Sequence, residues 1–172
     1  MALRMILQQG DPSLEKTSRA VTNFDDRLHT LLDDMRETME HANGVGLAAP
    51  QVGVLRRVAL VLDIQEVDDE DENVPPFTET LIEFINPVIL EADGEQTAFE
   101  GCLSIPGVQG NVTRPSRVKV RAQNRHGTFF EVEGTDFTAR VICHELDHLD
   151  GKLYTRLCDE LFDVNNLPEE SE

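Results

Sequence analysis

The sequence is short of positive charge. Its 172 residues contain 15 lysines and arginines against 33 aspartates and glutamates, so the formal net charge is −18. A chain this acidic repels phosphate groups, which disfavours direct binding to nucleic acid or to an anionic membrane. We therefore expect no direct nucleic-acid partner and no membrane partner.

Long apolar runs and a disulfide framework are missing too. The opening stretch MALRMILQQGDPS is apolar only briefly before a turn-like GDP, which is typical of neither a secretory signal nor a membrane span. The three cysteines, Cys102, Cys143 and Cys158, are odd in number and indicate no set of disulfides. Both absences favour a cytoplasmic protein, in whose reducing surroundings a lone thiolate is available to bind a metal.

What is present is the composition of an ordinary globular domain. Hydrophobic residues make up 40% of the chain and charged residues 28%, and a chain of this length buries a core without disulfides. We see no repeat and no second domain. We therefore expect one domain over residues 1–172, with an acidic, frayed tail from about residue 156.

Hydrophobic periodicity predicts a mixture of helices and strands. Apolar residues recur at helical spacing over 25–41, and Asp11 and Pro12 begin a short capped turn. Residues 57–64 and 80–90 are rich in β-branched side chains and predict strands, separated by an acidic loop over 66–76. Residues 116–134 alternate in two runs around RHGT, which predicts a β-hairpin.

A second helix is predicted over about 137–150. Thr135 or Asp136 is placed to cap its start, and Gly151 to end it. One face carries Phe137, Val141, His144 and His148, and a second face is apolar at the same spacing. Because a helix that is apolar on two sides is buried on two sides, we expect this helix to be central.

The stretch ICHELDHLDG, residues 142–151, carries the HExxH pattern of a metal site. Positions four apart on a helix differ by only about 40° in direction, so His144 and His148 are able to bind one ion. Glu145 is the next residue after His144 and is rotated from it by about 100° on the helix. This direction suits a base that acts on a metal-bound water. Two imidazoles are nevertheless only part of a zinc ligand set.

The residues alone do not decide which side chain is the third metal ligand. No histidine follows His148, and the later glutamates, Glu160, Glu169, Glu170 and Glu172, lie on the acidic tail. Upstream, FEGCLSIPG places Cys102 in a tightly turned segment, where it is either a ligand or a small buried apolar residue. Cys143 neighbours His144 on the helix and points about 100° away from it.

A third segment, GVGLAAPQVG at 44–53, follows the end of the first long helix. A helix stop explains Gly44, but it explains neither Gly46 nor a polar Gln51 in so apolar a run. We interpret the segment as a flexible loop whose side-chain amide is suited to hold an oxyanion beside a metal.

GVGLAAPQ, EGCLS and HELDH, in this order, resemble the three signature motifs of the peptide deformylases, over roughly residues 5–155. The resemblance implies an α+β fold of antiparallel sheets around the HExxH helix. It also implies hydrolysis of the N-formyl group from the formyl-methionine of nascent polypeptides, with release of formate. The protein would then be bacterial, with an organellar origin as the alternative.

The resemblance also implies roles for individual residues. Cys102, His144 and His148 would bind one divalent metal, Fe(II) or Zn(II), which Ni or Co replaces in some members. Glu145 would be the general acid and base, and Gln51 and the backbone N–H of Leu103 would stabilise the oxyanion. The substrate pocket would use Gly44, Val45, Gly46, Glu100, Gly101, Phe137 and Val141.

Around these residues the sequence suggests further roles. Arg114 and Asp147 are candidates for a pair that orients the ligands, and Arg140 near the rim would favour polar or acidic groups of the substrate. Phe99 stands where an acidic residue is common in the family. Family members often dock on the ribosome through a basic C-terminal helix, whereas residues 155–172 hold six acids and one base, which argues against that mode.

Two other functions are compatible with the motif. A zinc endopeptidase would take its third ligand from the tail, so that a chain cut at residue 155 would lose its metal. A deformylase-like protein that binds metal without turnover would have no reason to keep both Glu145 and Gln51.

Overall fold

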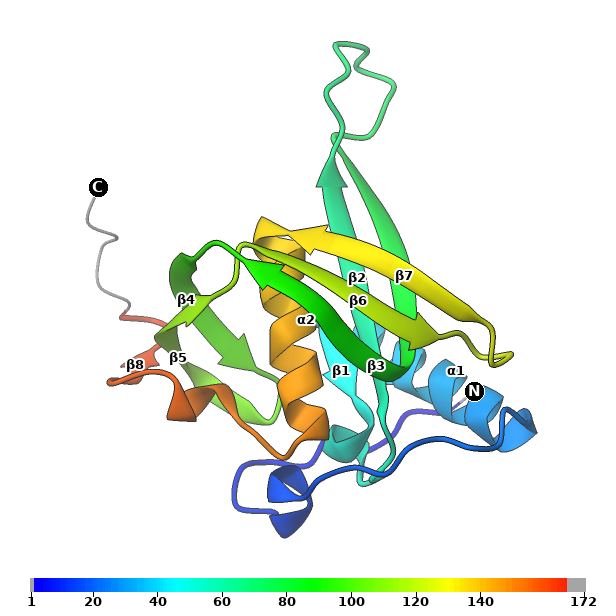
Figure 1. The fold of residues 1–172 in the computed structure, drawn as a ribbon. Coiled ribbons are helices and arrows are strands. Elements are labelled where there is room, and N and C mark those ends of the chain that lie inside the picture. The colour runs from blue at the N-terminus through cyan, green and yellow to red at the C-terminus, as the bar shows by residue number, and fades with distance from the viewer. Residues whose placement is uncertain (1, 167–172) are drawn as a thin grey trace.

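A helix between two antiparallel sheets dominates the computed structural model, which describes residues 2–166 (Figure 1). The larger sheet has the strand order β1-β2-β3-β6-β7 and the smaller one β4-β5-β8. This arrangement confirms the predicted α+β class with antiparallel sheets around the HExxH helix.

The elements of the larger sheet follow the hydrophobic pattern closely. Its strands are β1 (Gly46–Ala48), β2 (Val58–Glu66), β3 (Phe77–Asp93), β6 (Arg117–Gln123) and β7 (Phe129–Thr135). β6 and β7 form the predicted hairpin. The acidic loop joins β2 to β3 and projects away from the rest of the molecule (Figure 1).

The strand β3 is longer than the sequence predicts. Pro87 lies inside it, although proline cannot donate to a strand ladder. Asn86 adopts a φ of 52° there, and the pairing with β6 shifts register between Ile85 and Val88. The resulting bulge removes the need for a ladder hydrogen bond at the proline, so the strand continues past it.

Two long helices lie on opposite sides of the larger sheet in Figure 1. α1 (Asp26–His41) is capped by Asp25, whose side chain accepts a hydrogen bond from the N–H of Leu28 at 3.2 Å. α2 (Asp136–Leu149) begins after Thr135, which holds the N-cap position without a side-chain hydrogen bond. Except for Asp136, Phe137 and Asp147, every residue of α2 is buried. The prediction of a central helix is therefore confirmed.

The smaller sheet places a cysteine beside α2. β4 (Gln96–Cys102) turns directly into β5 (Ile105–Arg114), and the short β8 (Phe162–Asp163) pairs with β5. Three 3₁₀ turns, η1 (Pro12–Glu15), η2 (Ala49–Val52) and η3 (Tyr154–Arg156), complete the fold. Asp11 caps η1 as predicted.

The segment that the sequence predicts to be frayed from residue 156 differs from that expectation. It contains the end of η3 and the strand β8, and it is held to the smaller sheet by the packing of Cys158 and by the contact of Phe162 with Phe99. Residues 167–172, with the rest of the expected tail, lie outside the described part of the chain. Within the described residues no helix is both long and apolar enough to cross a membrane.

Candidate metal centre and active site

The helix α2 and the strand β4 bring three ligand atoms together. α2 supplies His144 and His148, and the end of β4 supplies Cys102. Their ligand atoms all lie within 4.8 Å of one another, and Sγ of Cys102 is 3.5 Å from Nε2 of His148. Within residues 2–166 this is the one group of at least three such side chains with metal-binding spacing.

The chemistry of this group fits a divalent cation. Nδ1 of His144 donates a hydrogen bond to Glu100 at 2.8 Å, which leaves its Nε2 for a metal, as in many zinc sites. Burial lowers the pKa of His148 well below its ordinary value, so the imidazole is neutral and able to ligate. One sulfur and two nitrogens favour a transition metal over magnesium or calcium.

Glu145 lies beside this group in a confined space. Its side chain is buried, and burial raises its pKa to about 7. Among the described residues, its Oε2 has no hydrogen-bond partner. A Cβ at Gly46 would lie 2.6 Å from its Oε1, so only glycine leaves room for the carboxylate. This contact explains the glycine that a helix stop leaves unexplained.

The segment that carries Gln51 is not a flexible loop, and that interpretation is wrong. Residues 46–48 form β1, which pairs with β2, and Gln51 lies in η2 with 1% of its surface exposed. Oε1 of Gln51 accepts a hydrogen bond from the N–H of Ala48 at 3.0 Å. Its Nε2 therefore faces the metal group and lies 3.5 Å from Sγ of Cys102 and 3.1 Å from Oγ of Ser104.

A buried ionic network holds His144 from behind. The carboxylate of Glu100 accepts hydrogen bonds from Arg114 at 3.0 and 2.9 Å, from Arg140 at 2.6 Å and from His144. Burial alone would raise the pKa of Glu100, but the hydrogen bonds from His144 and Arg114 outweigh it and lower the pKa to about 2. Arg114 also donates to Asp147 at 2.6 Å, which brings together the two residues predicted as a pair.

One expectation about this region needs correction. Glu100 borders the cavity, so its place in the substrate pocket stands as a prediction, and its carboxylate also accepts hydrogen bonds from Arg114, Arg140 and His144. Arg140 was expected at the rim, facing polar groups of the substrate. It is 4% exposed, and its guanidinium donates to Glu100 and to the carbonyls of Val112 and Gln96. A buried guanidinium needs such partners, because leaving it unpaired is costly.

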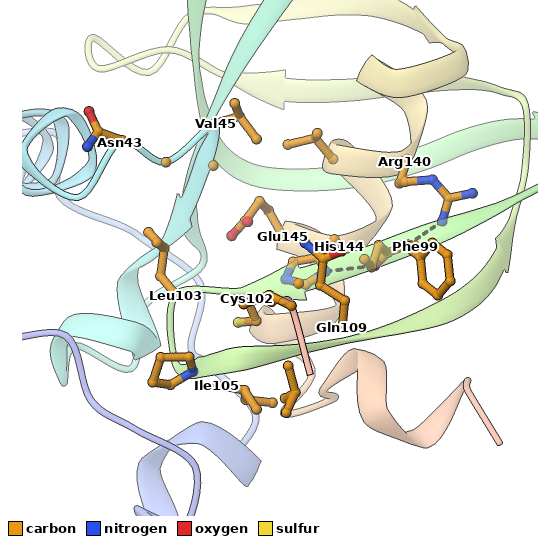
Figure 2. A pocket seen from close by; sticks show the side chains of 18 of the residues that line it. Asn43, Val45, Phe99, Cys102, Leu103, Ile105, Gln109, Arg140, His144 and Glu145 are labelled. Carbon is orange, nitrogen blue, oxygen red and sulfur yellow. Dashed lines mark hydrogen bonds and ion pairs between the residues drawn. The ribbon is translucent and has the colours of Figure 1, made fainter. Parts of the chain in front are cut away.

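A cavity of about 420 Å³ opens in front of the metal group (Figure 2). In Figure 2 Leu103 and Asn43 lie at one side of it, and Phe99 and Arg140 at the other, with Cys102, His144 and Glu145 between them. The predicted pocket residues all border the cavity: Gly44, Val45, Gly46, Glu100, Gly101, Phe137 and Val141. Leu103 borders it from the turn between β4 and β5.

Comparison with known proteins identifies the family. A family model described as polypeptide deformylase matches residues 3–161. The chain belongs to this family. It is therefore a metallohydrolase that acts on formylmethionyl peptides and removes the N-formyl group from nascent chains.

Among its relatives, the peptide deformylase of Alkaliphilus metalliredigens is 51% identical over 155 residues, which is 90% of this chain and 96% of that protein. The crystal structure of the Thermotoga maritima peptide deformylase is 38% identical, with a TM-score of 0.81 over 93% of this chain and all of that one. A class I type b peptide deformylase from Acinetobacter baumannii, solved with Met-Ala-Ser bound, is 32% identical with a TM-score of 0.81 over 91% of this chain and 98% of that one.

Family membership decides between the functions that the HExxH motif left open. The chain is a deformylase and not a general zinc endopeptidase. Glu160, one of the tail residues considered as a third ligand, is not part of the metal group. Glu169, Glu170 and Glu172 lie outside the described residues.

Several residues of this deformylase site were missed by sequence reasoning. Ser104 contacts Gln51, and it could have been found as the last residue of the quoted EGCLS motif. Gln109 and Val164 line the cavity, but no local pattern points to them. Cys143, which the sequence predicts to point about 100° away from His144, packs in the core, and burial raises the pKa of its thiol to about 11.

Proposed function

We propose that Cys102, His144 and His148 hold one Fe(II) or Zn(II) ion, which Ni or Co is able to replace. The support is the donor set: a thiol and two imidazoles within 4.8 Å, one imidazole oriented by Glu100. Three protein ligands leave a position open, as in catalytic zinc sites. The ion supplies a Lewis acid and lowers the pKa of a water molecule.

Glu145 is the general base and acid of this proposal. It takes a proton from the attacking water and later delivers it to the leaving amine of the methionine. Its pKa of about 7 supports both roles, because a group with this pKa exchanges protons readily near neutral pH. Its buried Oε2 has no hydrogen-bond partner among the described residues, which supports a water or substrate group as the partner of this atom.

Gln51 and the backbone N–H of Leu103 stabilise the oxygen that becomes negative when water attacks the formyl carbon. The support for Gln51 is its locked amide, whose Oε1 is held by Ala48 so that Nε2 points to the metal group. Donors that are held in place before the reaction need no reorganisation during it. Leu103 borders the same cavity from the turn that follows Cys102.

The methionine side chain occupies the apolar part of the cavity, lined by Val45, Phe137 and Val141. An unbranched thioether suits such a lining. The related Acinetobacter baumannii deformylase, crystallised with Met-Ala-Ser, supports a methionyl peptide as the occupant. The single observation that carries the proposal is the convergence of the HELDH helix, Cys102 and Gln51 on one cavity.

The setting of the reaction is also proposed. We propose that the enzyme works in the bacterial cytoplasm, which is supported by its bacterial relatives and by a substrate that is a nascent chain. Residues 155–172 carry six acids and one base, so contact with the ribosome through these residues would not use a basic surface. Residues 1–172 act as one deformylase domain.

An anaerobic assay tests the proposed roles. The purified protein is reconstituted with Fe(II) or Zn(II) and given formyl-Met-Ala-Ser and its acetyl analogue, with formate as the readout. We expect formate from the formyl peptide and no acetate from the analogue. Cys102→Ser should lose metal, while Glu145→Gln should keep metal and lose roughly 100-fold or more of the rate. A Glu145→Gln variant with full activity contradicts the proposal.

A further inference from the structure

The C-terminal segment, residues 158–164, reaches the cavity that contains the metal group through one residue, Val164. Val164 borders this cavity although it lies 62 residues after Cys102 in the sequence and outside every motif. Its side chain is 41% exposed, so it lies at the mouth. Val141, which also lines the cavity, is only 6% exposed and lies deep inside it.

Backbone pairing holds this segment against the smaller sheet. β8 pairs with β5, with Val108 opposite Asp163 and Gln109 opposite Phe162. The N–H of Val164 then donates to the carbonyl of Gly107 at 3.1 Å. Val108 and Gln109 line the cavity as well, so the pairing places Val164 next to the lining of β5.

Side-chain packing supports the same placement. The ring of Phe162 lies edge-on to Phe99, with ring centroids 5.8 Å apart. Phe99 also borders the cavity, so this contact connects the C-terminal segment to the cavity lining. Edge-to-face aromatic pairs of this kind contribute beyond the area that they bury.

Cys158 fixes the start of the segment. A Cβ at Gly110 of β5 would lie 2.7 Å from Sγ of Cys158, so the two residues are in close contact. Cys158 packs on the cluster that contains Tyr154, Val112 and Ile105. The segment is therefore attached at both ends, and Val164 is held in a defined position rather than on a free tail.

The cavity extends farther than formyl-methionine requires. Its volume of about 420 Å³ is within the range of pockets that enclose drug-sized ligands. The reacting end must lie at Glu145 and Cys102, and Val45 and Val141 line the part next to them. In Figure 2 Phe99 lies on the opposite side of the cavity from Val45. A peptide that runs from Glu145 to the mouth passes the wall formed by Phe99 and Val164.

We propose that Val164 and Phe99 contact the side chain of the residue that follows the methionine, and that they favour an apolar side chain at that position. This inference rests on the proposed function, because it needs formyl-methionine bound with its formyl carbon at the metal group. The two side chains are apolar. The guanidinium of Arg140, which also borders the cavity, is already paired with Glu100 and does not offer its charge to the substrate. A buried apolar contact is therefore the interaction that this wall offers.

The test uses full-length, metal-loaded protein and three substrates: formyl-Met-Leu-Ser, formyl-Met-Gly-Ser and formyl-methionine amide. In the parent protein we expect a higher kcat/KM for the leucine peptide than for the glycine peptide. Val164→Ala should reduce this ratio roughly threefold, because it removes apolar contact area at a partly exposed site. Val164→Trp narrows the mouth and should lower kcat/KM for the leucine peptide about tenfold. Both variants should change kcat/KM for formyl-methionine amide by a smaller factor than for the leucine peptide, because the amide lacks the residue that follows the methionine.

Val88→Trp is the matched control, since Val88 is an exposed valine on β3 that does not line the cavity. It should leave all three substrates unchanged. The inference is overturned if both Val164 variants keep the parent leucine-to-glycine ratio, or if they slow all three substrates equally. A parent protein that releases no formate from any substrate would instead show that the proposed function is wrong.

Discussion

Single residues at this site act within very little space. Gly46 lies in β1, directly beside the carboxylate of Glu145, and the ideal Cβ position there is 2.6 Å from Oε1 and 2.8 Å from Cγ. The strand is paired to β2 and cannot move away without breaking that pairing. A methyl group at residue 46 must therefore displace Glu145.

We predict that Gly46→Ala lowers kcat/KM about 100-fold, because small displacements of a catalytic group have effects of this size. Metal content and the melting temperature should change little. Formate release, metal analysis and thermal unfolding measure the three quantities.

The double variant Gly46→Ala/Glu145→Gln shows whether the effect passes through Glu145. If it does, the alanine adds no further loss once the carboxylate is gone. An additive loss, or a Gly46→Ala protein without metal, would contradict the prediction.

At the scale of elements, the buried network ties α2 to the smaller sheet. Arg140 and His144 of α2 and Arg114 of β5 all bond to Glu100 of β4, and all four side chains are less than 10% exposed. Removal of one partner leaves buried charge that is poorly compensated, which costs far more than removal of a surface ion pair.

For Arg140→Met we predict a loss of about 3 kcal/mol in the free energy of unfolding. We also predict metal binding that is roughly 10-fold weaker, because Glu100 no longer holds His144 as firmly. Urea unfolding and competition with a chelator measure these effects. Arg36→Met is the control, since Arg36 and Glu40 form an exposed pair on α1. If both variants behave alike, the network contributes nothing beyond a surface pair.

A second link between elements joins the N-terminal segment to α1. Asp34 accepts a hydrogen bond from the N–H of Ala2 at 2.8 Å and pairs with Arg4 at 2.9 Å. Burial alone would raise the pKa of Asp34, but these partners outweigh it and lower the pKa below the ordinary value of 3.8. Its stabilising effect is therefore complete above about pH 4 and is lost as the pH falls through the lower folded pKa.

We expect Asp34→Asn to be less stable than the parent protein at pH 7, with a difference that shrinks when the pH falls below about 3.8. Urea midpoints of the two proteins, both without metal, at pH 7 and pH 3 give this comparison. A difference that is equal at both pH values, or larger at pH 3, would show that the charge of Asp34 does not stabilise the fold.

At the scale of the whole molecule, a net charge of −18 on 172 residues opposes the compact state. Exposed ion pairs reduce this repulsion only locally, as where Arg117 pairs with Glu91, Asp93 and Glu133. Because such pairs contribute little in water, repulsion among the unpaired acids should dominate the response to salt.

We predict that the melting temperature rises by a few degrees between about 10 and 300 mM NaCl, since the Debye length falls from roughly 30 Å to under 10 Å. KCl at the same ionic strength should act equally. A melting temperature that falls over this range would show that exposed ion pairs outweigh the net repulsion.

The single domain over residues 1–172 stays a prediction. The described residues form two sheets that share α2, and the three sequence motifs all reach one cavity. That arrangement could be expected only from the family resemblance. No spacing within a motif says that β4 ends beside α2, because this contact joins residues more than 40 positions apart, Cys102 and His144.

The sequence by itself determined the features that depend on neighbours in the chain. These are the helix caps, the hairpin β6–β7, the two buried faces of α2 and the i, i+4 pair of histidines. Only the tertiary structure decided which way Gln51 faces, why residue 46 is glycine, what Arg140 binds and how Val164 enters the cavity. The physical reason is that burial and hydrogen-bond pairing of polar groups are satisfied by whichever residues the fold brings close, and sequence patterns describe only the chain's near neighbours.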